Sequence, residues 1–310
     1  MPIKVCIVGC GAIGSIFAAH LSQLGDVEVY ALDTSEQHIR AIRENGLRVS
    51  GPAVEFVARL HATRDPQDIP RCDFGILATK SGHTRNAIER TSHIFSNSGV
   101  VCSVQNGLGN EEIIAEYVSN VIRGATTMAA HLIAPGCVGF EFYSDIWLGP
   151  FEPADTSFQT VQQFASLLNR SGLRAVALPD ARGAQWTKLI FNSAVNSVDA
   201  LTLLDHGSAT RFPATAALYE SLLREGEAVA KALGIQLYGD VRHMIAEGAN
   251  AAGKRNVSML LDVLNQRPTE VDFLNGAIAD WGEKLGIPVP LNRALWQLIR
   301  GLEYSWGRTE

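Results

Sequence analysis

The stretch from Ile3 to Asp33 constrains the fold of this chain more than any other part of it. It begins with a short apolar run, Ile3 to Val8, passes through a glycine-rich turn at residues 9–14, and then shows apolar residues at helical spacing up to Leu24. A second apolar run, Val27 to Leu32, leads to Asp33. Because short β-branched runs bounded by glycine are typical of strands buried on both faces, this order predicts a strand, a turn, a helix and a parallel strand.

The turn reads Gly9-Cys10-Gly11-Ala12-Ile13-Gly14, and each glycine has a physical role there. Gly9 permits the tight turn, Gly11 lets the backbone approach a pyrophosphate, and Gly14 lets the helix pack on the strand. Asp33 stands 33 − 14 = 19 positions after Gly14, where a carboxylate holds the ribose hydroxyls of a dinucleotide. A glycine-rich turn in another kind of α/β protein is the alternative, but the flanking strand, helix and Asp favour a Rossmann-type site. We therefore predict a dinucleotide with its phosphates at the N-terminus of the helix, bound by Gly9, Cys10, Gly11, Ala12, Ile13, Gly14 and Asp33.

The length, charge and cysteines narrow the class of protein. At 310 residues, of which 46% are hydrophobic and 19% are charged, the chain is long enough for two globular domains of ordinary size. The formal net charge of −6 argues against a nucleic-acid or anionic-membrane partner, because such partners need a basic patch. The five cysteines are scattered without a C-x-x-C pair and no metal-binding cluster is visible, so we expect reduced thiols in a cytoplasmic protein.

After Asp33 the predicted helices and strands alternate. The pattern indicates helices over residues 36–44, 83–95 and 155–170, a hairpin over 47–60, and strands over 74–79, 100–104, 174–178 and within 123–150. Lys80 and Asn106 follow two of these strands, and the carboxyl ends of parallel strands would bring both residues beside a bound dinucleotide. A solvated Lys and a turn-forming Asn-Gly explain the same positions equally well.

Beyond Pro179 the strand pattern stops and only helical patterns follow, over residues 181–195, 214–233, 240–252, 258–264, 270–285 and 291–304. The sequence therefore predicts a Rossmann-type α/β domain over residues 1–179 and an all-helical domain over residues 180–310.

Two polar motifs stand out in the helical half. Lys188, Asn192 and Asn196 are four residues apart and share one helix face, which suits a polar task, although a solvated stripe fits the spacing better when it is taken alone. Thr269 and Asp272 have the spacing of a capping box, which predicts that Glu270 lies in the first turn of a helix.

Taken together, these motifs resemble the ketopantoate reductase (2-dehydropantoate 2-reductase) family over nearly the whole chain. The resemblance rests on the glycine turn, Thr79-Lys80, Gln105-Asn106-Gly107-Leu108-Gly109, Gly124-Ala125-Thr126-Thr127, Trp186-Thr187-Lys188-Leu189 with Asn192 and Asn196, Ser258-Met259-Leu260, and Arg267-Pro268-Thr269-Glu270. It implies reduction of a 2-oxo acid to a D-2-hydroxy acid with a nicotinamide cofactor, in the cleft between a Rossmann domain and a helical domain.

The resemblance also implies roles for single residues. Lys188 would be the general acid, with Glu270 assisting it and holding substrate; Asn192 and Ser258 would bind substrate, and Asn106 and Lys80 would place cofactor and substrate. The residue types suit this reaction, because hydride transfer to a ketone leaves charge on oxygen and an ammonium group can neutralise it by giving up a proton.

The chain departs from the family near both ligands. Asp33-Thr34-Ser35-Glu36 stands where members that use NADPH carry a basic residue, so we predict a preference for NADH, unless Arg40 reaches the same place. Around the substrate, His206 and Asp199 replace a usual Asn and Thr, and Arg255 with Asn256 replaces a usual Asn. We predict a redrawn pocket formed by Asn192, Asn196, Ser258, Asn256, His206 and Asp199. A surface position explains His206 equally well.

The predicted function is NAD(P)H-dependent reduction of ketopantoate to pantoate, on a small-molecule 2-oxo acid and by a monomer or homodimer. The nearest alternative is an NAD-dependent D-2-hydroxy acid dehydrogenase of the same family that acts on another branched or aromatic 2-oxo acid. A protein that senses NAD(P) without catalysis is a third candidate, which the retention of Lys188 and Glu270 disfavours. Polyol-phosphate and hydroxyacid dehydrogenases also use a helical Lys and Asn, and the stretch from Arg267 to Glu270 separates this chain from them.

Overall fold

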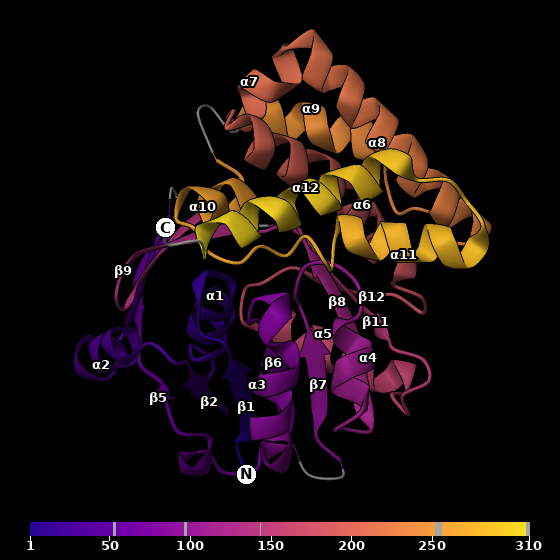
Figure 1. Cartoon of the computed structure of the whole chain (residues 1–310). Helices are drawn as coiled ribbons and strands as arrows, with labels where there is room; N and C mark the ends of the chain where they lie inside the picture. The colour runs from indigo at the N-terminus through magenta and orange to yellow at the C-terminus, as the bar shows by residue number, and fades with distance from the viewer. Residues whose placement is uncertain (52–53, 96–97, 143, 252–255, 308–310) are drawn as a thin grey trace. The chain divides into compact units, whose positions relative to one another are not determined.

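A computed structural model describes residues 1–51, 54–95, 98–142, 144–251 and 256–307 of the chain. The chain folds into two compact units, one formed by Met1–Gln105 with Asn110–Ala181 and the other by Asn106–Gly109 with Arg182–Glu310 (Figure 1). The first is an α/β unit and the second is helical, as the sequence predicts. The short segment Asn106–Gly109 belongs to the helical unit, although it lies between strands of the α/β unit in the sequence.

The α/β unit is built on an eight-stranded sheet with the order β12-β11-β8-β7-β6-β1-β2-β5. Its strands are β1 (Ile3–Val8), β2 (Val27–Leu32), β5 (His61–Thr63), β6 (Phe74–Leu77), β7 (Val100–Ser103), β8 (Asn120–Thr126), β11 (Ile146–Pro150) and β12 (Ala175–Ala177). All neighbours are parallel except β8 and β11. The strand order runs outward from β1 in both directions, and open α/β sheets bind ligands beyond the carboxyl ends of the strands at such a reversal.

Helices cover both faces of this sheet. They are α1 (Ala12–Leu21), α2 (Glu36–Asn45), α3 (Thr84–Thr91), α4 (Asn110–Ala115) and α5 (Phe158–Arg170), with short 3-10 turns at Pro66–Asp68, Ser81–His83 and Ser92–Ile94. Alternate residues of β1 enter two separate cores: Ile7 packs in the core that holds Phe17 of α1, and Val8 packs in the core that holds Ile88 of α3. This double burial explains why β1 reads as a continuous apolar run.

A second, four-stranded sheet with the order β4-β3-β10-β9 also belongs to the α/β unit. Its strands are β3 (Leu47–Ser50), β4 (Glu55–Ala58), β9 (Ala129–Ala134) and β10 (Cys137–Phe142). The predicted hairpin is confirmed by the antiparallel pairing of β3 with β4, although Pro52 in its turn lies outside the described residues. A turn at Pro135-Gly136 joins the antiparallel strands β9 and β10, and Gly136 has a φ of +73° there.

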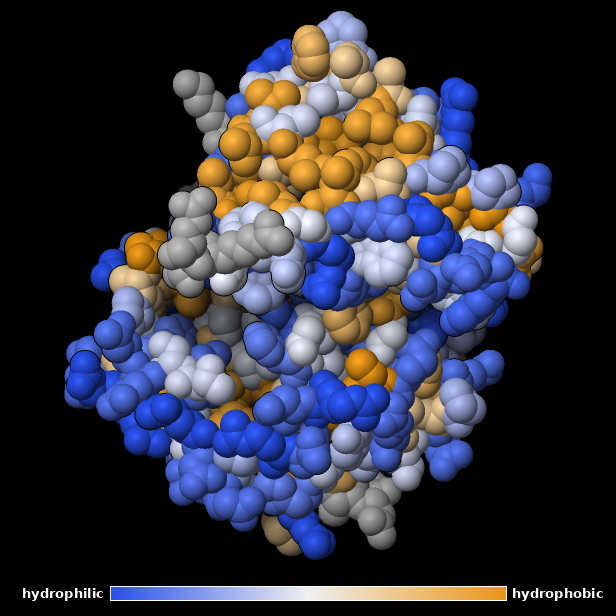
Figure 2. All heavy atoms as spheres, viewed as in Figure 1, coloured by the Kyte–Doolittle hydropathy of each residue, from blue (hydrophilic) through white to orange (hydrophobic). Residues whose placement is uncertain are grey.

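The helical unit contains α6 (Arg182–Thr202), α7 (His206–Arg211), α8 (Pro213–Ala232), α9 (Val241–Ala251), α10 (Ser258–Leu264), α11 (Asn275–Leu285) and α12 (Pro290–Trp306). α6 is its central helix, because it packs against α7, α8, α9, α10 and α12. Within the described residues no helix is long and apolar enough to cross a membrane. On the face drawn in Figure 2, hydrophobic residues gather over α7 to α9, and Leu203 and Phe212 at the two ends of α7 are more than half exposed.

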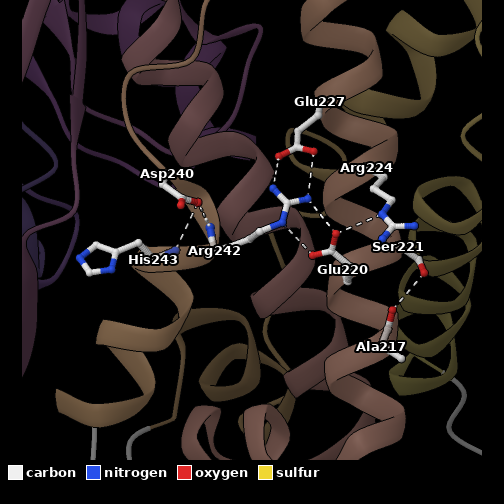
Figure 3. Close-up of polar contacts among 8 residues, drawn as sticks. All are labelled: Ala217, Glu220, Ser221, Arg224, Glu227, Asp240, Arg242 and His243. Atoms are coloured by element: carbon white, nitrogen blue, oxygen red, sulfur yellow. Dashed lines mark hydrogen bonds and ion pairs between the residues drawn. The ribbon is translucent and has the colours of Figure 1, made fainter.

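Charged side chains form ion pairs between these helices and accept hydrogen bonds at their N-termini. Arg242 of α9 binds two carboxylates of α8, with Nη2 at 2.8 Å from Glu220 Oε1 and Nη1 at 2.5 Å from Glu227 Oε1 (Figure 3). Asp240 accepts a hydrogen bond from the Arg242 backbone N–H and so starts α9. Glu225 accepts hydrogen bonds from the first backbone N–H groups of α12, at 2.9 Å each.

The structure corrects two helix boundaries. α6 continues to Thr202 instead of ending at Val195, because polar side chains in its last turns find partners within the helical unit. The predicted helix start at Glu270 is wrong, since α11 begins at Asn275 and Glu270 precedes it in a turn. The Thr269 backbone N–H, which a capping box would direct to the side chain of Asp272, donates to Glu303 at 2.7 Å instead, and Thr269 Oγ1 accepts from the Val271 N–H at 3.3 Å.

Candidate functional site

The glycine turn after β1 has the shape that a pyrophosphate needs. Gly9 has a φ of +90°, and a Cβ added there would lie 2.7 Å from the Thr79 backbone N. A Cβ on Gly14 would lie 2.1 Å from the Gly9 carbonyl oxygen, so α1 can start close to the strand only with glycine at this position. A Cβ on Gly11 would meet nothing within 4 Å, which leaves open space beside the backbone.

In the part of the chain that the structure describes, no side chain caps α1, so the first backbone N–H groups of this helix are available to a ligand. Gly11 is the N-cap and has no side chain to accept hydrogen bonds from the backbone N–H groups that follow it. Ala12 and Ile13 are half-buried, whereas Cys10 is fully buried and its thiol pKa is raised to about 12 by burial. Cys10 therefore contributes backbone to the turn, and the whole turn fits the diphosphate of a dinucleotide.

Asp33 lies at the carboxyl end of β2, where the sequence places it. Its Oδ1 accepts a hydrogen bond from the Ser35 backbone N–H at 2.9 Å, and its own N–H donates to the Thr63 carbonyl at 3.2 Å. Ser35 in turn caps α2, with Oγ accepting from the His38 N–H. Within the described residues, Asp33 Oδ2 receives no hydrogen bond, so one carboxylate oxygen can accept from a ribose diol.

Lys80 also lies at the carboxyl edge of the sheet, three residues after β6 ends at Leu77. The backbone before it is fixed, because Gln105 Nε2 donates to the Thr79 carbonyl at 3.0 Å. Thr79 also lies against Gly9 of the glycine turn. The backbone at the exposed Lys80 is therefore fixed beside that turn.

A second polar cluster lies within the helical unit. Lys188 and Asn192 occupy successive turns of α6, and Asn192 Nδ2 lies 3.5 Å from Asn106 Oδ1. Asn106 Nδ2 donates to Glu270 Oε2 at 2.9 Å. The segment that carries Asn106 is held by Phe273, whose carbonyl accepts from the Leu108 N–H at 3.0 Å. Asn106, predicted beside the cofactor, is therefore hydrogen-bonded to the predicted catalytic carboxylate.

The electrostatics of this cluster favour proton exchange near neutral pH. Burial lowers the pKa of the Lys188 ammonium from its usual 10.5 to about 8, against the raising effect of the nearby Glu270 carboxylate. Glu270 itself is only 5% exposed. A buried Lys that keeps a carboxylate partner and titrates near neutrality has the properties of a general acid.

The predicted substrate residues fall into two groups. Asn196 is buried on α6, Ser258 is the exposed first residue of α10, and Asn256 is exposed just before it. Arg255 lies outside the described residues.

Asp199 and His206 form a different cluster, buried with Tyr219. Tyr219 Oη donates to Asp199, His206 Nδ1 lies 3.6 Å from Asp199 Oδ2, and His206 Nε2 contacts the Ile245 carbonyl at 3.1 Å. His206 is 4% exposed, so the surface alternative for it is wrong. Asp199 follows Lys188 by 199 − 188 = 11 residues on one helix, which separates them by about 16 Å along its axis. These two side chains therefore lie away from the Lys188 cluster.

The positions of the metal-binding residue types and of the cysteines can also be compared with the prediction. Among the described residues, no three His, Cys, Asp or Glu side chains are grouped so that they could hold a metal ion. All five cysteines are free, and four of them are buried.

Two family models and several curated relatives match nearly the whole chain. The family described as "Ketopantoate reductase PanE/ApbA" matches residues 5–153, and "Ketopantoate reductase PanE/ApbA C terminal" matches residues 180–303. The chain is 32% identical to the 2-dehydropantoate 2-reductase of Archaeoglobus fulgidus over 300 residues, covering 97% of this chain and 98% of the relative. The Pyrococcus abyssi protein of the same name is 30% identical over 306 residues, covering 99% and 100%.

Two solved structures are similar over their whole length. A PanE/ApbA family ketopantoate reductase from Ralstonia eutropha JMP134 matches with a TM-score of 0.89 and 29% identity, covering 99% of this chain and all of the other. D-mandelate dehydrogenase in complex with NADH and anilino(oxo)acetate matches with the same TM-score and 26% identity, again over 99% and 100%.

Proposed function

The chain belongs to the ketopantoate reductase family, and from this premise we propose that it reduces a 2-oxo acid to a D-2-hydroxy acid with a nicotinamide dinucleotide. The observation that carries the proposal is the cluster of Lys188, Asn192, Asn106 and Glu270 in the helical unit. A protein that only sensed the dinucleotide would have no use for a buried Lys whose pKa lies near neutrality.

Each residue of the cluster has a proposed task. Lys188 donates the proton that the substrate oxygen needs when the carbonyl is reduced, and Glu270 keeps that Lys protonated until then. Asn106 orients the Glu270 carboxylate through its amide N–H, while Asn192 bonds the other end of the same amide. Asn192 and Asn196 on α6, with Asn256 and Ser258 at the start of α10, are proposed to bind the substrate.

The dinucleotide is proposed to bind the α/β unit. When bound, it supplies a hydride. The backbone of the glycine turn would hold its diphosphate, and Asp33 would accept hydrogen bonds from its adenosine ribose. Lys80, at the carboxyl edge of the same sheet, is proposed to help place cofactor and substrate.

We propose NADH as the preferred cofactor. A carboxylate at the tip of β2 attracts two hydroxyl donors and repels a phosphate, and the half-buried Asp33 keeps one carboxylate oxygen for that purpose. Ketopantoate is the first substrate to test, because the relatives from Archaeoglobus fulgidus and Pyrococcus abyssi are named for it.

The second candidate is an NAD-dependent D-2-hydroxy acid dehydrogenase of the same family that acts on an aromatic or another branched 2-oxo acid. Asp33 favours it, as does the similarity to a D-mandelate dehydrogenase that was solved with NADH. A cytoplasmic location and a monomeric or homodimeric state stay predictions from the sequence.

The test is an initial-rate assay of nicotinamide oxidation. Ketopantoate and the 2-oxo acid that corresponds to mandelate are each combined with NADH and NADPH. We expect turnover of at least one of them, faster with NADH. Fast turnover of ketopantoate with NADPH would contradict the NADH preference, and no turnover with a broad panel of 2-oxo acids would contradict the proposed function.

Lys188→Ala checks the assigned proton donor in the same assay. We expect NADH binding to persist and kcat to fall roughly 10²–10³-fold, which corresponds to an activation free energy higher by about 3–4 kcal/mol. Lys231→Ala is the matched control, since Lys231 is exposed near the end of α8. Near-normal turnover in Lys188→Ala would rule out the assigned role.

A further inference from the structure

A cation lies against the turn that follows Asp33. β2 and β5 are parallel neighbours, and their carboxyl ends are joined where the Asp33 N–H donates to the Thr63 carbonyl at 3.2 Å. Arg64 is the next residue. Its Nε donates to the Thr34 carbonyl at 3.1 Å, and its Nη1 lies 3.4 Å from Glu36 Oε2. The guanidinium therefore lies along the segment Asp33–Glu36.

The two contacts of Arg64 differ in the group that accepts. The hydrogen bond to Thr34 uses a backbone carbonyl, so a change of side chain in the turn does not remove its acceptor. The ion pair with Glu36 is exposed, with 53% and 71% of the two side chains accessible, and pairs of this kind contribute only about 0–1 kcal/mol. Another anion that arrives at this place can therefore replace Glu36 as the partner of Arg64.

The chemistry of the guanidinium indicates which anion that is. Arg binds phosphate through two parallel N–H donors, and a 2′-phosphate is the one group that distinguishes NADPH from NADH. Glu36 places a negative charge beside this cation, and the Asp33 carboxylate, which accepts from the Ser35 N–H in the same turn, adds a second charge that repels a phosphate there. Arg40, the cation that the sequence suggested, lies on the exposed side of α2, whereas Arg64 is hydrogen-bonded to the turn itself.

We propose that Arg64 faces the 2′ position of the adenosine ribose, and that Asp33 and Glu36 restrict it to a dinucleotide without a 2′-phosphate. The inference rests on the proposed function, because it takes the glycine turn and Asp33 to be the dinucleotide site. Arg64 is thus a specificity-determining residue: while it pairs with Glu36 and the Asp33 carboxylate occupies the same turn, the site takes NADH, and with both carboxylates removed Arg64 binds the phosphate of NADPH.

Binding of two cofactor fragments tests this without any turnover. ADP-ribose and 2′-phospho-ADP-ribose are titrated calorimetrically into the full chain. We expect the wild type to bind ADP-ribose at least about tenfold more tightly. The double variant Asp33→Ser with Glu36→Gln should reverse this preference, with an affinity for 2′-phospho-ADP-ribose about 10²-fold above that of the wild type.

Adding Arg64→Met to the double variant should cancel the gain, while adding Arg40→Met should leave it in place. The gained affinity should also fall steeply between low and high salt, as an exposed phosphate contact does. Thermal unfolding midpoints equal to that of the wild type would show that all variants are folded.

The outcomes separate the inference from the function on which it rests. A gain that survives Arg64→Met, or that Arg40→Met removes, would overturn the role of Arg64 and leave the proposed function standing. A folded wild-type chain that binds neither fragment would overturn the proposed function and this inference with it.

Discussion

Replacing Glu270 with Gln should shift the pH dependence of reduction to lower pH. The proposed reaction needs Lys188 in its protonated form, and burial has lowered the pKa of that ammonium to about 8, while the Glu270 carboxylate raises it. The wild-type rate should therefore fall about tenfold between pH 7 and pH 9, instead of staying level to about pH 10. Gln removes the raising effect, and each 1.4 kcal/mol of lost attraction moves the midpoint down by about one pH unit.

The assay is kcat/KM for the 2-oxo acid from pH 6 to pH 10 at saturating cofactor. Oxidation of the hydroxy acid, which needs neutral Lys188, should show the opposite slope and rise through the same midpoint. Lys188→Arg should be less active, and its pH profile should show no midpoint near pH 8, because a guanidinium does not release its proton in this range. Glu247→Gln, the same chemical change on an exposed residue of α9, should leave the profile unchanged.

Two results would refute the reasoning. A wild-type midpoint near 10.5 would mean that the Lys188 ammonium is not held in a buried place. A midpoint near 8 that is the same in Glu270→Gln would mean that the carboxylate does not act on this ammonium, and the assigned pair would have to be abandoned.

Four further substitutions test the glycine turn and the packing of the helical unit. Gly14→Ala should destabilise the chain by about 1–3 kcal/mol in denaturant unfolding, because its Cβ would lie 2.1 Å from a backbone carbonyl oxygen. Gly11→Ala should leave the free energy of unfolding unchanged, because its Cβ would meet nothing within 4 Å, and it should weaken dinucleotide binding in calorimetry. Tyr219→Phe should lower the free energy of unfolding by about 1–3 kcal/mol in urea titrations, since it removes a hydroxyl donor from the fully buried carboxylate of Asp199. Glu225→Ala should lower it by about 1–3 kcal/mol in the same titrations, because two backbone N–H groups of α12 lose their acceptor. An unchanged unfolding midpoint in Gly14→Ala, Tyr219→Phe or Glu225→Ala would contradict the assignment that the variant tests.

Local patterns in the sequence were sufficient for most of the fold. β1 and β2 begin and end where their apolar runs do, and α10 has the predicted bounds Ser258–Leu264. The roles of the glycines could be predicted too, because they depend on the turn and its immediate neighbours. In all these cases the residues that decide the conformation are close to one another in the sequence.

Contacts between distant residues could not be predicted in the same way. The predicted capping box is absent from the start of α11 because Glu303, 34 residues beyond Thr269, takes the Thr269 backbone N–H that the box would have directed to Asp272. Asn106 looked like a cofactor residue because it follows a strand, and no local signal indicated that its amide meets Glu270, 164 residues later. His206 was predicted in the substrate pocket, with a surface position as the alternative, and its contacts with Asp199 and Ile245 could not be predicted because these partners lie on two other helices.

The displaced helix start changes the physical account of the proposed catalytic pair. In the first turn of a helix, the Glu270 carboxylate would be stabilised by the helix dipole, independently of any other segment. In the turn before α11, it depends instead on the amide of Asn106, which a segment from between β7 and β8 supplies. The carboxylate that raises the pKa of Lys188 therefore accepts a hydrogen bond from a segment that directly follows Gln105 in the chain. The surroundings of the proposed proton donor thus combine α6, the turn before α11 and a segment far from both in the sequence, which is why the sequence pattern alone could not predict them.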